Sequence, residues 1–158
     1  MLTSHDQTIA STTLVVDQVT HTIRLERRLA ASPAEVFAAW TVPEQVACWW
    51  DPTGQPLTIC EIDLRPDGAF KFVAKGHSDM PFAGVYQDID PPGRLTFEAM
   101  GAAGRVLLVE DGDTTRLSVE IQCHSAEHLK QFMQAGVHEG TSRTLDNLVA
   151  YVGARASR

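Results

Sequence analysis

The histidines are the side chains of this sequence with the clearest capacity to hold a metal ion. His124 and His128 are the one pair among the six histidines with the four-residue spacing of a helical metal site. His124, however, precedes Ser125, the residue expected to cap the helix, so the two side chains need not share a face. Solvent-exposed polar residues are the simpler interpretation. We therefore expect neither a metal nor a cofactor.

The sequence has three cysteines, Cys48, Cys60 and Cys123. They have neither the spacing of metal ligands nor the even number of a disulfide framework. Each lies in or beside an apolar run, which is typical of small core residues. Unpaired cysteines fit a reducing compartment. The N-terminal residues also lack the basic start and apolar run of a secretory signal, so we expect a cytoplasmic protein.

Four residues are candidate acid–base groups for an enclosed site: His77, Tyr86, Asp88 and His138. No spacing brings any two of them together, and the motifs HExxH and GxSxG are absent. The stretch GAAG, residues 101–104, is expected to form a hairpin loop and not a phosphate-binding turn. An enzyme of the cyclase or hydrolase type is therefore the alternative, and a binding protein is the preferred interpretation.

The aromatic residues cluster, since nine of the eleven lie between Phe37 and Phe97. Small-molecule sites are mostly apolar and aromatic, with a few polar groups, so the cluster predicts a lined pocket. Ordinary core packing is the competing explanation and accounts for most of these residues. The candidate lining combines this cluster with methionines and a stripe of small residues near the C-terminus: Trp40, Trp50, Phe70, Phe72, Met80, Phe82, Tyr86, Phe97, Phe132, Met133, Gly136 and Gly140.

The elements that must position these residues follow from the hydrophobic pattern. Residues 12–29 predict one extended strand, and Ser32, Pro33 and Glu35 predict a capped helix that a second short helix from Pro43 follows. Six further strands joined by short turns predict an antiparallel meander: residues 56–64, 68–75, 81–90, 94–100, 105–111 and 114–123. The order predicts a single α+β domain over residues 12–158, after a flexible N-terminus at 1–11.

The last element is expected to be one long amphipathic helix over residues 125–152, with Gly136 and Gly140 inside it. An interior glycine costs a helix about 1 kcal/mol relative to alanine. Two explanations remain open. Either sheet side chains pack against the bare helix backbone, or that backbone forms the wall of a cavity.

The acidic composition argues against several partners. A net charge of −7 and an isoelectric point near 5.2 disfavour nucleic-acid binding, which depends on clustered Lys and Arg. No stretch approaches the roughly 20 apolar residues of a membrane span. We expect no nucleic-acid partner and no stable membrane insertion.

Three stretches carry a resemblance to a known family: SPAEVFAAWTVPEQVACWWDPTG, GVYQDIDPPGRLTFE and GVHEGTSRTLDNLVAYV. Together they resemble the activator of heat shock protein 90 ATPase homologue family, within the START-like SRPBCC superfamily, over residues 20–152. The resemblance implies a helix-grip fold, in which a curved seven-stranded antiparallel sheet wraps around a long C-terminal helix. It also implies an apolar cavity between sheet and helix for a small hydrophobic or amphipathic ligand, as in superfamily relatives that bind lipids, hormones or polyketides.

Two departures from the family pattern refine this expectation. Thr141 stands where family members often carry Trp, so the resemblance implies a larger cavity with one added hydroxyl, and Thr141 joins the candidate lining. The family's co-chaperones have a separate N-terminal domain, whereas about twenty residues precede the fold here, so chaperone binding is not expected. A protein-interaction role is a further alternative, in which residues 12–20 pair with a partner's sheet edge, as in a homodimer.

Overall fold

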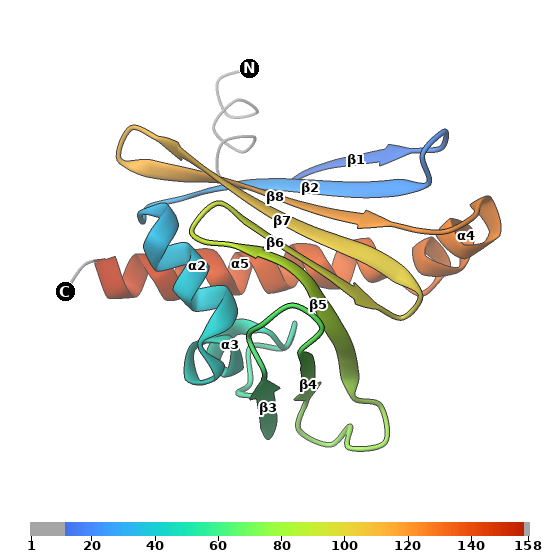
Figure 1. Ribbon diagram of the computed structural model, residues 1–158, viewed down its shortest axis with the longest axis horizontal. Coiled ribbons are helices and arrows are strands. Elements are labelled where there is room, and N and C mark those ends of the chain that lie inside the picture. Colours follow the sequence, from blue (N-terminus) through green and yellow to red (C-terminus); the bar gives the residue numbers. More distant parts are fainter. Residues whose placement is uncertain (1–11, 157–158) are drawn as a thin grey trace.

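A computed structural model describes residues 12–156, which form one antiparallel sheet of eight strands and four helices (Figure 1). The strands lie in the order β1-β2-β8-β7-β6-β5-β4-β3. Their bounds are β1 Thr13–Asp17, β2 Thr22–Leu29, β3 Ile59–Ile62, β4 Ala69–Val73, β5 Phe82–Asp90, β6 Arg94–Ala99, β7 Ala102–Asp111 and β8 Thr114–Gln122. The helices are α2 Pro33–Thr41, α3 Pro43–Trp49, α4 Ala126–Gln134 and α5 Val137–Ala156. The α+β class and the six-stranded meander are thus confirmed, while the N-terminal segment expected to be flexible lies outside the described residues.

The expected first strand is in fact a hairpin, which is why the sheet has eight strands and not seven. The Asp17 carboxylate accepts hydrogen bonds from the backbone N–H groups of Val19 (2.8 Å) and Thr20 (3.2 Å), and His21 adopts a left-handed conformation with φ 57°. These bonds also lower the pKa of Asp17. The chain therefore reverses after Asp17, and β1 pairs antiparallel with β2.

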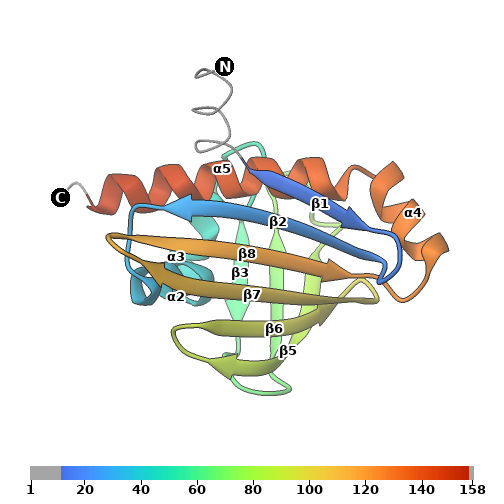
Figure 2. The same cartoon turned by 90° about the horizontal axis from the view of Figure 1, so that it is seen from above.

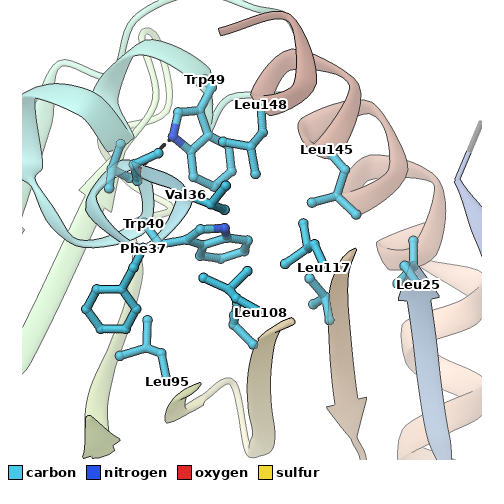
Figure 3. Close-up of a cluster of buried hydrophobic side chains, with 14 of the residues drawn as sticks. Leu25, Val36, Phe37, Trp40, Trp49, Leu95, Leu108, Leu117, Leu145 and Leu148 are labelled. Carbon is cyan, nitrogen blue, oxygen red and sulfur yellow. Dashed lines mark hydrogen bonds between the residues drawn. The ribbon is translucent and has the colours of Figure 1, made fainter. Parts of the chain in front are cut away.

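The two short helices follow their predicted signals. The Ser32 hydroxyl accepts from the Glu35 N–H (3.2 Å), and the Glu35 carboxylate accepts from the Ser32 N–H (3.0 Å), which completes a capping box at the start of α2. Pro33 and Pro43 occupy the first turns of α2 and α3. The Trp49 indole N–H donates to the Ala39 carbonyl at 3.0 Å, which joins the two helices inside the core (Figure 3).

The C-terminal helix is interrupted, contrary to the expectation of one continuous helix. α4 ends at Gln134, and Gly136 has φ +76°, a left-handed conformation that favours glycine. Gly136 is therefore the terminator of α4 and not an interior helix residue. Gly140 does lie inside α5, which runs beside β2 along the sheet (Figure 2).

The two glycines should respond to alanine in opposite directions. Gly136→Ala is expected to lower the free energy of unfolding by about 1–2 kcal/mol, because alanine is strained at positive φ. Gly140→Ala is expected to raise it by about 0.5–1 kcal/mol, because a Cβ there meets only the Pro52 Cγ, at 3.9 Å. Urea unfolding of the two variants measures both effects. Equal destabilisation by the two substitutions would contradict the assigned roles.

The core lies between the sheet and helices α2, α3 and α5. Along β2 the inward positions alternate with exposed or partly exposed ones, and all four inward residues are buried: Ile23, Leu25, Arg27 and Leu29. Arg27 is the charged exception, and its guanidinium donates to the Asp146 carboxylate of α5 and to the Thr12 hydroxyl. Arg27 therefore does not lie on the solvated face of the strand but joins β2 to α5. Within residues 12–156, no helix combines the length and apolar character needed to cross a membrane.

Candidate functional site

An apolar cavity of about 260 Å³ lies between the inner face of the sheet and the helices. Trp40 comes from α2, and Trp50 directly follows the last residue of α3. Phe132 comes from α4, and α5 supplies a run of small residues. The strands β5 to β8 close the opposite side. The complete lining is Trp40, Trp50, Pro52, Phe82, Phe97, Ala99, Met100, Ala102, Gly104, Val119, Ile121, Phe132, Val137, Gly140, Thr141, Thr144 and Leu145.

Small residues on both walls leave this space open. On α5, Gly140, Thr141 and Thr144 follow one another along the face that looks toward the sheet. A Cβ at Gly140 would touch only Pro52, so no sheet side chain presses against the helix backbone there. Of the two explanations for this glycine, the structure supports the cavity wall.

Gly104 plays a part that the sequence did not reveal. It was expected in a hairpin loop, but the turn is formed by Met100 and Gly101 alone, and Ala102 already belongs to β7. Gly104 lies opposite Phe97 on β6, and a Cβ there would lie 2.4 Å from the Phe97 ring. The ring therefore packs directly on the β7 backbone and forms the floor of the cavity.

A second group of aromatic residues fills its space and leaves no cavity. Phe70 lies 5.2 Å from Phe72 and 5.0 Å from Tyr86, measured between ring centroids. These three side chains are at most 5% exposed, and the gap beside them measures about 20 Å³. For them, core packing is the better explanation.

The structure brings seven of the thirteen predicted lining residues to the cavity: Trp40, Trp50, Phe82, Phe97, Phe132, Gly140 and Thr141. The other six lie elsewhere. Met80 is 72% exposed in the connection before β5, Met133 packs against the core, and Gly136 ends α4, while Phe70, Phe72 and Tyr86 form the filled cluster. Of the residues that the prediction missed, Thr144 lies on the same small-residue stripe of the helix as Gly140 and was detectable from it, and Leu145 is the bulky residue that follows it.

No titratable side chain lines the cavity among the described residues. Of the candidate acid–base groups, His77 and Asp88 are exposed, and His138 is half-buried at the start of α5. Tyr86 lies in the filled cluster, where burial raises the pKa of its phenol. Burial also raises the pKa of the nearby Cys60 thiol to about 11, so this thiol is protonated at neutral pH. The geometry brings none of these groups together as an acid–base pair.

The histidine pair lies at the N-terminal end of α4. The His124 and His128 rings stack with centroids 4.1 Å apart, and the His124 backbone N–H donates to His128 Nδ1 at 3.2 Å. His128 is buried against Phe132, which corrects the expectation of an exposed pair. No group of three or more metal-ligating side chains occurs within residues 12–156.

A larger hollow of about 520 Å³ lies on the outer face of the sheet, and its lining is polar. Its three arginines already have carboxylate partners: Arg24 lies 3.6 Å from Glu26, Arg94 lies 3.8 Å from Asp88, and Arg105 lies 3.5 Å from Glu120. Exposed pairs of this kind are common on solvated sheet faces and contribute little to stability. Ligand sites are mostly apolar and bury most of the ligand, so the inner cavity is the stronger candidate despite its smaller volume.

Comparison with solved structures supports the fold. A protein from Rhodobacter sphaeroides matches with a TM-score of 0.80 and 19% identity, covering 90% of this chain and 98% of the other. A protein from Nitrosomonas europaea matches with a TM-score of 0.78 and 21% identity, over 87% of this chain and 97% of the other. The AHSA1-like protein from Aeromonas hydrophila matches with a TM-score of 0.70 and 25% identity, over 87% of this chain and 95% of the other.

Comparison with curated proteins gave no match. A family model does match, over residues 30–153, which include both short helices, strands β3 to β8 and nearly all of α5. That model describes the activator of Hsp90 ATPase homolog 1-like proteins, in agreement with the motifs at residues 32–54, 84–98 and 136–152. The chain therefore belongs to the family of activator of Hsp90 ATPase homolog 1-like proteins.

Proposed function

We propose that the protein binds a small hydrophobic or amphipathic molecule in the cavity between the sheet and α5. The observation that carries this proposal is an open space of about 260 Å³ with an uncharged, largely apolar lining. Most cores fill such a space, because an empty cavity forfeits both dispersion contacts and hydrophobic stabilisation. A ligand would restore both. The position of α5 against the concave side of the sheet also favours a helix-grip arrangement.

The composition of the lining favours binding over catalysis. A cyclase or hydrolase needs an acid, a base or a nucleophile that reaches the substrate. The described lining offers two threonine hydroxyls and two indole N–H groups as its polar side-chain groups. The unpaired cysteines Cys48, Cys60 and Cys123 support placing this binding protein in a reducing cytoplasm.

Thermal unfolding in the presence of small molecules tests the proposal. A ligand that binds only the folded state, at 100 times its Kd, adds about 2.7 kcal/mol to the free energy of unfolding. The panel should contain monocyclic terpenoids, aromatic metabolites, fatty acids and sterols. We expect stabilisation by at least one of the smaller apolar members. No stabilisation by any member would contradict the proposal.

A second role, self-association, is favoured by the edge strand β1. Leu14 and Val16 face the same side as the buried Leu25 and Ile23 of β2, yet Leu14 is 44% exposed. An antiparallel pairing of two copies centred on Val15 would place Leu14 beside Val16 of the other copy. It would also keep the two Asp17 carboxylates apart. The strand has no proline, lysine or bulge to prevent such pairing.

Light scattering tests this second role. The protein is expected to reach the mass of a dimer at high concentration, and Val15→Glu is expected to abolish the dimer by opposing two carboxylates. Val109→Glu is the matched control, because Val109 is 49% exposed on the inner strand β7. A monomeric mass at all concentrations, or a dimer that survives Val15→Glu, would contradict pairing through β1.

A further inference from the structure

The chemistry of the cavity lining restricts the class of ligand, and this inference rests on the proposed binding function. Apart from two threonines and two tryptophans, the lining residues are apolar, and none carries a charge. Burial of an ionised group without a partner costs several kcal/mol. A carboxylate or an ammonium group inside this cavity would therefore have no compensating contact.

Three hydrogen-bonding groups of the lining lack a partner among residues 12–156: the indole N–H groups of Trp40 and Trp50, which can only donate, and the Thr141 hydroxyl, which can donate and accept. Trp40 and Thr141 differ in accessibility. The Trp40 indole N–H is enclosed by protein atoms, and its ring packs edge-on against Trp49 with centroids 4.9 Å apart. A ligand cannot reach that nitrogen. The Thr141 hydroxyl forms no hydrogen bond with the described chain, and it is not enclosed.

The neighbouring Thr144, in the same wall of the cavity, has a hydroxyl that already forms a hydrogen bond within the protein. Its Oγ1 donates to the Trp50 carbonyl at 3.0 Å and so ties α5 to the end of α3. Its hydroxyl proton is therefore not available to a ligand. Thr141, one helical turn earlier, keeps both its donor and its acceptor capacity for a molecule in the cavity.

The volume limits the size of the occupant. A water molecule takes up roughly 30 Å³ of liquid, so about 260 Å³ corresponds to roughly nine water volumes and to about ten non-hydrogen atoms. Ligand pockets typically measure about 300–1,000 Å³, and this cavity lies just below that range. A sterol or a phospholipid chain is larger than this volume.

We propose that the cavity takes a neutral molecule of about ten non-hydrogen atoms whose single oxygen, a hydroxyl or a carbonyl, pairs with the Thr141 hydroxyl. The apolar body of this molecule contacts Phe97 and Phe132, and its oxygen points toward α5. Thr141 is thus the residue that distinguishes an oxygenated ligand from a plain hydrocarbon of the same shape.

Four probes with one carbon skeleton test the proposal: menthol, menthane, menthylamine and menthane carboxylate. Their affinities are measured for the wild type and for Thr141→Val, which keeps the shape of the side chain and removes its hydroxyl. Because Trp40 and Trp50 line the cavity, tryptophan fluorescence reports binding. Thr13→Val, at an exposed position on β1, is the control for threonine replacement.

The ratio of menthol affinity to menthane affinity is expected to fall roughly three- to tenfold in Thr141→Val, the range of one neutral hydrogen bond, and to stay constant in Thr13→Val. The amine and the carboxylate are expected to bind the wild type more weakly than menthol. An unchanged ratio in Thr141→Val, or charged probes that bind as tightly as menthol, would overturn this inference and leave the binding function intact. Failure of all four probes to bind would overturn this inference, and the binding function itself would be contradicted if no member of the wider panel stabilised the protein either.

Discussion

Replacing Thr141 by Trp is expected to abolish stabilisation by small apolar ligands while the protein stays folded. The Thr141 side chain borders the cavity from α5, and an indole at this position would occupy most of a space of about 260 Å³. The variant should gain the apolar burial that a ligand would otherwise supply, so its own thermal stability should stay equal to that of the wild type or increase. The ligand-dependent gain of about 2.7 kcal/mol at 100 times the Kd should disappear. Thermal unfolding with and without ligand measures both quantities.

A tryptophan at Ala150 is the matched control for this substitution. Ala150 is exposed on the same helix and lies outside the cavity lining, so Ala150→Trp adds the same side chain without filling the site. Its ligand response should equal that of the wild type. If Thr141→Trp retains the full response as well, the ligand lies somewhere other than this cavity.

Removing the Asp146 carboxylate is expected to lower the free energy of unfolding by about 2–3 kcal/mol. The Arg27 side chain is 6% exposed and donates to this carboxylate, while its Nε already lacks a partner among the described residues. In Asp146→Ala a buried guanidinium would lose its counter-charge, which is among the costlier single changes in a core. The estimate lies below the usual range for buried pairs, because the Asp146 side chain is 62% exposed and already partly solvated.

Arg27→Met removes the other partner and should behave differently. The Met side chain retains apolar contacts beside Leu25 and Leu29, and the exposed Asp146 that remains is solvated by water. We expect a change within about 1 kcal/mol of the wild type. Denaturant unfolding of the two variants provides the comparison. A loss in Arg27→Met as large as that in Asp146→Ala would show that the ion pair itself stabilises the fold.

Strands β3 to β8 and the first two helices were predictable because local signals and tertiary structure agree there. Alternating apolar residues define β5 to β8, and Ser32 with Glu35 caps α2 as the sequence indicates. The hairpin after Asp17 was missed because the turn depends on side-chain bonds to the backbone, and no glycine or proline marks it. The break at Gly136 was missed because its spacing from Gly140 also fits an uninterrupted helix.

The site was predictable as a location but not as a set of residues. Phe72 and Phe97 both point inward, so strand alternation cannot distinguish a ring that fills space from one that borders it. That distinction depends on the register that places Gly104 opposite Phe97, and register is a long-range property of the sheet. The prediction that Met80 lines the cavity was wrong for a related reason, since the sequence does not indicate where the side chain of a methionine between two strands points.

A crystal structure of the protein under xenon pressure tests most directly whether the cavity between the sheet and α5 is open. Xenon enters dry apolar cavities without needing a specific contact, so it reports an accessible cavity before any natural ligand is known. Xenon density bounded by Phe97, Phe132 and Thr141 is expected in the wild type, and none at that place in Thr141→Trp. A wild-type crystal in which side chains close the space and no xenon binds there would show that this fold does not keep an apolar cavity open.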